Sequence, residues 1–255
     1  MIKELKLYLL LLTLLSNAIT VLAQQEGANN DSIITPENIN YIKYWGKDTV
    51  AVELEEEQPW SKFLKLELIS KDLYEHKKSS AVKYLLADTS LYKMRNNTIS
   101  LPCKNKTVVL TNKTNEVEAW EEYTYVGQLP ILNAYLVKGL FYEELEYFLV
   151  DKITGEQTTY FGEFPFISPN KKFIIYLSSN PYDLNAEVGV YEIKNKKIQH
   201  LINLSFSNWM PDEQENIFWS NDGYLYLRAN HPSVYWLEDG RVNTMWQYLR
   251  VKLAN

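Results

Sequence analysis

The chain has 255 residues, 26 basic and 32 acidic side chains, and a formal net charge of −6 at neutral pH. This acidic balance argues against nucleic acid and anionic membrane surfaces as partners, because both attract basic patches. The single cysteine, Cys103, excludes an internal disulfide, so the core must hold without a covalent cross-link.

The first residues have the pattern of an export signal. Lys3 and Lys6 precede an almost unbroken apolar run at residues 7–15, and a more polar stretch then ends at Val21 and Ala23. The apolar run is shorter than the roughly 20 residues that a spanning helix needs. We therefore predict a cleavable signal peptide at residues 1–23, cut after Ala23, and a secreted or periplasmic protein with no membrane span after signal removal.

Beyond the signal, the pattern predicts an all-β protein with one short helix. Residues 24–40 are polar and Asn-rich and are predicted to be a flexible lead-in. Residues 41–122 are predicted to be an irregular β region, in which residues 63–69 alternate apolar and charged side chains as a half-buried strand does. Ser70 is the expected cap of a short polar helix near residues 70–80.

Short strands alternate with polar turns through the rest of the chain. Turns such as Asn221-Asp-Gly223 and Asp239-Gly240 favour tight hairpins, because glycine readily takes the positive backbone angles that such hairpins need. Many short strands at regular spacing are typical of a sandwich, a barrel or a propeller. The predicted strands are residues 41–45, 82–86, 98–101, 107–110, 123–126, 134–140, 146–150, 158–161, 173–177, 188–193, 197–202, 217–220, 224–228, 234–237 and 246–251.

Two stretches near the C-terminus share one pattern, in which a polar turn with proline precedes a β-branched or aromatic strand. The turns are Ser168-Pro-Asn170 and Met210-Pro-Asp212. Residues 166–201 resemble a blade of TolB-like and WD-type β-propellers, and the resemblance extends over about residues 123–253. It implies a propeller-like array of four-stranded antiparallel sheets at residues 123–255, either closed or left open and capped by the helix. The whole chain also resembles small exported proteins of Bacteroidota-type bacteria, which implies no activity.

No catalytic or cofactor motif stands out, and we expect no cofactor and no metal. The histidines His76, His200 and His231 have neither metal-ligand spacing nor a cysteine partner at a zinc-site interval. A nucleophile elbow, a phosphate-binding glycine loop and a zinc-protease helix motif are all missing from the sequence. We interpret Cys103 as a small buried apolar side chain.

Oxygen-bearing side chains leave two alternatives open. Four of them between residues 180 and 187 could wrap calcium, but calcium prefers six to eight oxygens, so a plain loop between strands is the better interpretation. A hydrolase would need two carboxylates held across a cleft, a distance that the sequence does not give. The candidates are Asn180, Asp183, Asn185 and Glu187 for the metal, and Glu116, Glu118, Glu121, Glu122, Glu143, Glu144 and Glu146 for the hydrolase.

Aromatic residues are the largest compositional excess, with 7 Trp and 19 Tyr. Alternation in the strand at residues 224–228 places Leu225 and Leu227 on one face and Tyr224, Tyr226 and Arg228 on the other. The aromatic rings either pack between sheets or form an exposed contact surface, because exposed aromatic patches mark interfaces. The candidate ligand-binding residues are Tyr224, Tyr226, Arg228, His231, Tyr235 and Trp236.

These observations predict an exported, non-catalytic binding protein with a protein or glycan ligand. The alternatives are a carbohydrate-active hydrolase that uses paired carboxylates, and a structural component of a cell-surface assembly. If the tyrosine face is a contact surface, replacing Tyr224 and Tyr226 by alanine weakens partner binding and leaves the melting temperature nearly unchanged.

Overall fold

The computed structural model describes residues 32–46, 59–115, 119–142, 144–180 and 182–254. The chain divides into two units, residues 1–33 and residues 34–255, and the description below concerns the second. The predicted signal peptide and its cleavage site lie outside the described residues, as do three of the candidate carboxylates, Glu116, Glu118 and Glu143.

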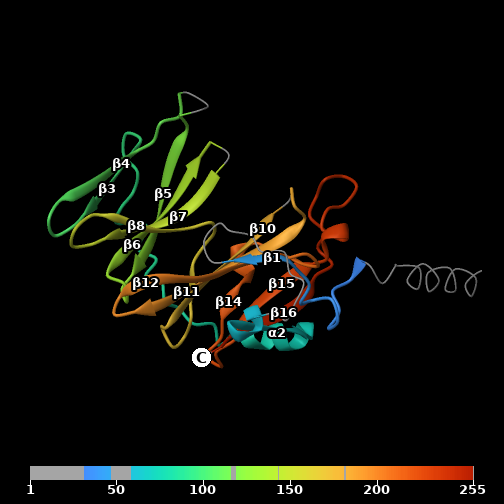
Figure 1. Ribbon diagram of the computed structural model, residues 1–255. Helices are drawn as coiled ribbons and strands as arrows, with labels where there is room; N and C mark the ends of the chain where they lie inside the picture. The colour runs from blue at the N-terminus through green and yellow to red at the C-terminus, as the bar shows by residue number, and fades with distance from the viewer. Residues whose placement is uncertain (1–31, 47–58, 116–118, 143, 181, 255) are drawn as a thin grey trace, which may run out of the picture. The chain divides into compact units, whose positions relative to one another are not determined.

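Antiparallel sheets of four and five strands make up most of the fold, and they do not close into a barrel, which confirms the predicted all-β class (Figure 1). Sheet I contains β5 (Glu121–Leu129), β6 (Ala134–Phe141), β7 (Glu144–Asp151) and β8 (Gln157–Phe161). Sheet II contains, in spatial order, β1 (Ile42–Gly46), β12 (Lys197–Phe206), β11 (Asn185–Lys194), β10 (Phe173–Asn180) and β9 (Phe166–Ile167). Sheet III contains β13 (Met210–Pro211), β15 (Leu225–Asn230), β16 (Gln247–Leu253) and β2 (Leu64–Ile69), with β14 (Phe218–Trp219) also paired to β15.

Shorter elements complete the fold. The α-helix α2 (Lys71–Lys78) starts after the predicted cap Ser70, whose hydroxyl accepts a hydrogen bond from the Leu73 N–H at 3.2 Å. None of the helices in the described residues is both long enough and apolar enough to cross a membrane. The remaining elements are the hairpin β3 (Thr98–Pro102) and β4 (Thr107–Thr111) and the 3-10 turns η2 (Pro59–Lys62), η3 (Gln214–Asn216) and η4 (Pro232–Val234).

The sheets pack face to face, because strands in the middle of the stack bury both of their faces. In sheet I, Leu136 packs toward sheet II while its neighbour Val137 packs against the β3–β4 hairpin. In sheet II, Ile174 packs toward sheet I while Ile175 packs toward sheet III. Burial on both faces explains why the β10 sequence is an apolar run rather than an alternation.

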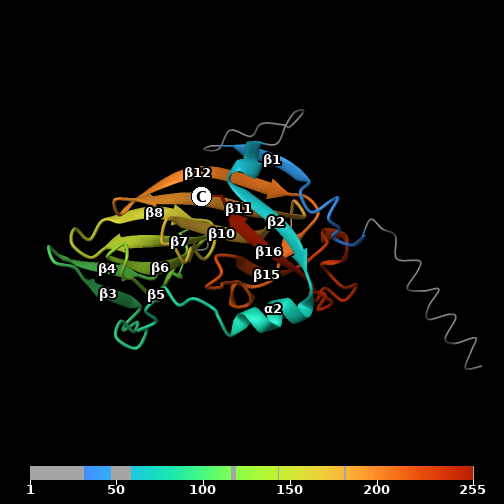
Figure 2. The same cartoon turned by 90° about the horizontal axis from the view of Figure 1, so that it is seen from below.

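The helix α2 covers the outer face of sheet III. Figure 2 shows it beside β15 and β16. Tyr74 of the helix is fully buried, and its ring lies 5.3 Å from that of Phe218 and 5.0 Å from that of Tyr248. The Tyr74 hydroxyl donates to the carbonyl of Asn216 at 2.8 Å. The helix is therefore fixed by a buried aromatic side chain on an otherwise polar segment.

Strands from the first part of the chain complete sheets formed by the last part. β1 pairs with β12 at the edge of sheet II, and β2 pairs with β16 at the edge of sheet III. Leu64 and Leu66 of β2 point into the shared core, as the alternation at residues 63–69 predicts. The predicted regions 41–122 and 123–255 therefore share two sheets.

Residues 34–40 are packed in place, which corrects the prediction of a flexible lead-in up to residue 40. Ile34 and Ile39 are each only 2% exposed and belong to the core between sheets II and III. The Gln247 side chain bonds both backbone groups of Ile34, at 2.7 and 2.8 Å. Burying an isoleucine contributes about 1.5–3 kcal/mol, so these two side chains favour a packed segment despite the polar residues around them.

Two predicted strands are wrong for local reasons. Residues 82–86 run as an irregular connection with a single bridge, from Leu86 to Gln128. Residues 234–237 follow Pro232, whose ring favours the first turn of the 3-10 helix η4, and only Trp236 forms a bridge, to Val242.

Apart from β1 and β2, the strands of the three sheets follow one another along the chain, in runs that begin at Glu121, Phe166 and Met210. The turns that correspond in position are Ser168–Lys172 before β10 and Ser220–Gly223 before β15, whereas Pro211 lies within β13. The pairing of Pro169 with Pro211 in the sequence pattern is therefore wrong. The propeller resemblance itself stays a prediction, because sheets stack by their faces in open arrays as well as in rings.

Candidate functional site

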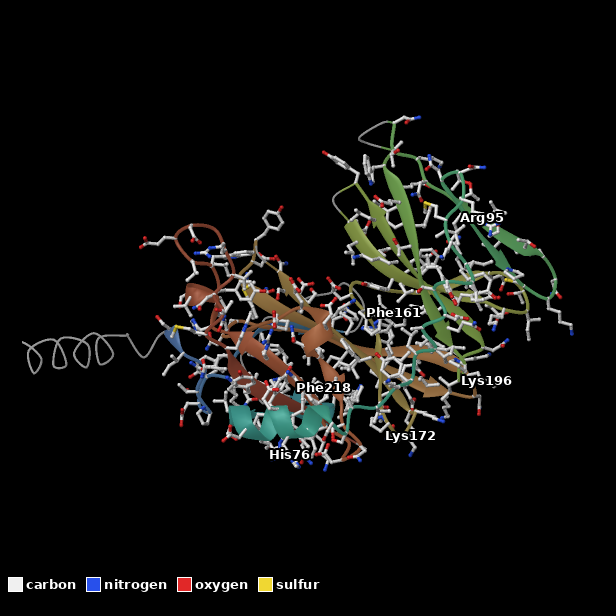
Figure 3. All side chains as sticks on the ribbon, turned by 180° about the vertical axis from the view of Figure 1, so that it is seen from behind. His76, Arg95, Phe161, Lys172, Lys196 and Phe218 are labelled. Atoms are coloured by element: carbon white, nitrogen blue, oxygen red, sulfur yellow. The ribbon has the colours of Figure 1, made fainter. Side chains whose placement is uncertain are left out.

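The strongest candidate for a contact site lies where β10 and β15 end. We call this the contact end: the loop at residues 231–246 together with the β10–β11 turn, residues 180 and 182–185. Ser179 donates to the carbonyl of Pro211 at 2.6 Å, and its hydroxyl lies 3.4 Å from that of Tyr235. These contacts hold the loop and the turn side by side (Figures 1 and 3).

Hydrogen bonds of buried side chains fix the loop of the contact end. The buried Tyr235 donates its hydroxyl to the carbonyl of Pro211 at 3.2 Å. Asn243 donates its side-chain amide to the carbonyl of Val234 at 2.9 Å and its backbone N–H to that of Tyr235 at 2.8 Å. The buried Asn230 donates in turn to the carbonyl of Asn243. In this loop the buried Tyr235 and the partly buried Asn243 both have partners, as a fixed loop requires, whereas the buried side chain of Asn185 in the neighbouring turn has none.

Large apolar side chains project from this fixed frame into solvent. Trp236 is 44% exposed and Met245 is 82% exposed, while Tyr182 on the neighbouring turn is 96% exposed. Trp236 lies in a short hairpin that turns at Asp239-Gly240, with glycine at φ +80°, as predicted. Exposed apolar side chains that gather on an ordered loop mark interaction sites. Leu184 on the turn and Leu237 on the loop are exposed as well.

Two of the predicted ligand-binding residues are buried. Tyr226 is fully buried and stacks on Phe218 with ring centroids 5.6 Å apart and an interplanar angle of 12°. Its hydroxyl donates to Asp222 at 2.9 Å. Burial, followed by the Asp222 bond, raises the pKa of Tyr226 to about 12. Tyr226 therefore supports sheet III from within, and Tyr235 supports the loop of the contact end. Neither side chain can touch a partner directly.

Tyr224 and Arg228 share the face that the alternation predicts, and both are half-buried by neighbours. The Arg250 guanidinium lies 4.2 Å from the Tyr224 ring and the Lys252 ammonium lies 5.3 Å from it. Arg228 donates through Nε to Asp212 at 2.7 Å and lies over the Trp246 ring at 5.1 Å. Both side chains thus make their contacts with other residues of the protein.

Of the six predicted residues, His231 and Trp236 lie on the contact end with exposed surface. His231 caps η4, since its ring nitrogen accepts from the Ser233 N–H at 3.3 Å. Trp236 is the one that projects. Three exposed residues of the contact end are not among the six predicted ones: Tyr182, Leu184 and Met245. A signal for Tyr182 exists, because an aromatic residue in a polar turn between two strands has no sheet face on which to pack.

The described candidate carboxylates Glu144 and Glu146 and the loop oxygens near residue 180 have structural surroundings. Burial, followed by the neighbouring Glu144, raises the pKa of Glu146. The two residues lie on one strand, two positions apart, and not across a cleft as glycoside hydrolysis needs. Asn180 accepts from the backbone N–H groups of Tyr182 and Asp183, each at 3.0 Å, so it stabilises the turn. The described part of the chain contains no group of three acidic, His or Cys side chains placed to hold a metal.

Comparisons of the chain with protein-family models, with curated proteins and with solved structures found no match.

Proposed function

We propose that the chain is an exported binding protein whose contact end docks a partner protein. The observation that carries the proposal is the exposure of Trp236 and Met245 on a loop that buried hydrogen bonds hold in one shape. A preformed surface loses little conformational freedom on binding, so more of the contact energy remains as affinity.

The composition of the surface favours a protein over a glycan. Leucine and methionine side chains pack against other apolar side chains, and methionine and the aromatic residues are enriched at protein interfaces. Charged pairs lie on the same loop and turn as the apolar side chains: Arg241 donates to Asp239 at 2.7 Å, and Lys43 lies 3.5 Å from Asp183. An apolar centre with a polar rim is the usual anatomy of a protein interface.

Export is part of this proposal. A basic start, a short apolar run and a small residue at position 23 support removal of residues 1–23. Mass spectrometry of the protein recovered from the producing cell tests it, with Gln24 as the expected first residue. Recovery of an intact N-terminus from the cytosol would overturn the export part.

Site-specific photo-cross-linking tests the docking surface. A photoreactive phenylalanine analogue at position 236 or 245 is expected to give discrete cross-links to a protein, and the same analogue at position 109 is the control. Val109 is a matched site because it is 57% exposed and apolar and lies on β4 of the outer hairpin. Equal cross-linking at positions 109 and 236, or none at either, would overturn the proposed surface.

A glycan array with the wild-type protein and the Trp236→Ala variant separates the two ligand classes. If the partner is a protein, we expect no glycan signal that depends on Trp236: no glycan should bind the wild type and fail to bind Trp236→Ala. A strong signal that disappears in the variant would keep the surface and replace the partner with a carbohydrate.

A further inference from the structure

A second candidate site lies at the opposite ends of the same strands, where β10 and β15 begin. The turns Ser168–Lys172 and Ser220–Gly223 line a pocket of about 340 Å³ there. Lys172 and Phe218, the neighbour of Trp219, mark this region in Figure 3. Pockets of about 300–1,000 Å³ are the usual size for small ligands. The turns that precede β10 and β15 therefore meet at one concave surface.

One of the residues that line the pocket, Trp219, has a buried donor without a partner. Trp219 is 1% exposed, and its indole N–H makes no hydrogen bond. Trp209, equally buried, instead donates its indole N–H to the carbonyl of Ile39 at 3.2 Å. A buried donor without an acceptor costs about 1–3 kcal/mol. An acceptor atom that entered the pocket and met this N–H would recover that cost.

A cation lies at the rim of the same pocket. Lys252 of β16 lines it, and within the part of the chain that the structure describes its ammonium forms no salt bridge. Its nearest aromatic contact is the Tyr224 ring at 5.3 Å. The ammonium therefore has hydrogen-bonding capacity for an anion, and it stands out in a protein whose net charge is −6.

The carboxylate in the pocket is already bound within the protein. Asp222 accepts from Tyr226 at 2.9 Å and pairs with Lys77 of α2 at 2.8 Å. Burial opposes its ionisation, yet the bonds from Lys77 and Tyr226 hold the pKa of Asp222 below its usual value. Asp222 is thus a charged and satisfied group, and the Trp219 indole N–H and the Lys252 ammonium are donors left to meet a ligand.

We propose that this pocket binds a small carboxylate with an apolar body. The carboxylate accepts from the Trp219 indole N–H and pairs with Lys252, while the apolar body packs against Phe173 and Leu253. One cation and one neutral donor match a single negative charge, so a monocarboxylate fits better than a phosphate dianion. The site is separate from the contact end and does not depend on the proposed partner.

Titration calorimetry on the mature protein with benzoate as the probe tests this. One saturable site is expected, and binding should weaken roughly tenfold in Trp219→Phe and in Lys252→Gln, because each removes one charge-assisted contact. Lys65→Gln is the matched control. Lys65 lies on β2, is exposed, and is the register partner of Lys252 on β16. Benzamide, which has the same shape without the charge, should bind more weakly than benzoate.

Three outcomes would overturn the proposal. One is the lack of a saturable signal, which would mean that the pocket holds only water. Another is equal affinity of wild type and Lys252→Gln for benzoate, and the third is equal binding of benzoate and benzamide. Lys252 lies on the surface, so this variant keeps the test decisive even if Trp219→Phe does not fold.

Discussion

The two ends of strands β10 and β15 differ in what they present to solvent: one end has exposed apolar side chains, and the other has a pocket. At the contact end, Tyr235, Asn230 and Asn243 have hydrogen-bond partners that fix the loop, the buried Asn185 of the neighbouring turn has none, and large apolar side chains are exposed. At the turn end, a concave surface keeps an unpartnered buried donor, that of Trp219. Exposed apolar side chains on an ordered loop suit a large partner, whereas a pocket suits a small one. The two proposed sites therefore call for different kinds of ligand.

The largest expected effect sharpens the difference between supporting and contacting aromatic residues. Tyr226→Ala should lower the free energy of unfolding by about 3–5 kcal/mol, because it empties a fully buried site and removes a stacked ring. Trp236→Ala should change it by no more than about 0.5 kcal/mol, as exposed positions do. Urea denaturation measures both. Equal losses in the two variants would contradict the assignment of Trp236 to a free surface.

This contrast shows what the sequence can and cannot predict. Alternation places Tyr224, Tyr226 and Arg228 on one face and Leu225 and Leu227 on the other, and the structure confirms that division. What covers each face depends on distant parts of the chain. β14 and Asp222 bury Tyr226, and α2 extends the cover over the neighbouring Tyr248. The alternation of residues along one strand carries no information about which distant elements cover each face.

The same limit applies to the sheets and to both candidate sites. The cap Ser70 and the Asp-Gly turn at residues 239–240 act through neighbouring residues, so they could be predicted. The pairing of β2 with β16 joins residues far apart in the sequence and could not. The pocket likewise needs two turns about fifty residues apart to lie together, and only packing reveals that.

A second prediction tests whether hydrogen bonds hold the contact end in shape. Asn243→Ala removes the bond to the carbonyl of Val234 and the bond accepted from the Met245 N–H at 2.9 Å. Unfolding should become easier by about 1–3 kcal/mol, and trypsin should cleave after Arg241 faster than in wild type. Asn221→Ala, in the exposed turn at the other end, is the control. Unchanged cleavage after Arg241 would show that the loop is fixed by other means.

A third prediction compares two buried tryptophans. Trp209→Phe loses the indole bond to Ile39 and leaves that carbonyl unpaired, so it should cost about 1–3 kcal/mol beyond the smaller ring. Trp219→Phe removes only a donor without a partner. Its loss of unfolding free energy should therefore be smaller than that of Trp209→Phe, by about 1 kcal/mol or more. Paired urea unfolding curves give the difference. A larger loss in Trp219→Phe would mean that its N–H is satisfied, which would remove the main support for the pocket.

The smallest effect concerns charge on the outer face of sheet III. Glu67 on β2 faces Arg250, which donates to it at 2.6 Å, and Lys65 lies 2.9 Å away. The bond from Lys65, followed by that from Arg250, lowers the pKa of Glu67 below its ordinary value of 4.5. Because the folded-state pKa is the lower one, this stabilisation is present above pH 4.5 and is lost as the pH falls through the folded-state pKa.

Glu67→Gln should therefore be less stable than wild type by about 0.5–1 kcal/mol at pH 7, and the difference should shrink toward zero near pH 3. Added salt should reduce it at neutral pH, because the pair is partly exposed. In an Arg250→Gln background the substitution should have a smaller effect, since the second-largest cause of the shift is gone. A difference that grows as the pH falls would reverse the sign of the argument: Glu67 would then be a carboxylate that the fold prefers protonated, and the Lys65 and Arg250 contacts would not be the forces acting on it.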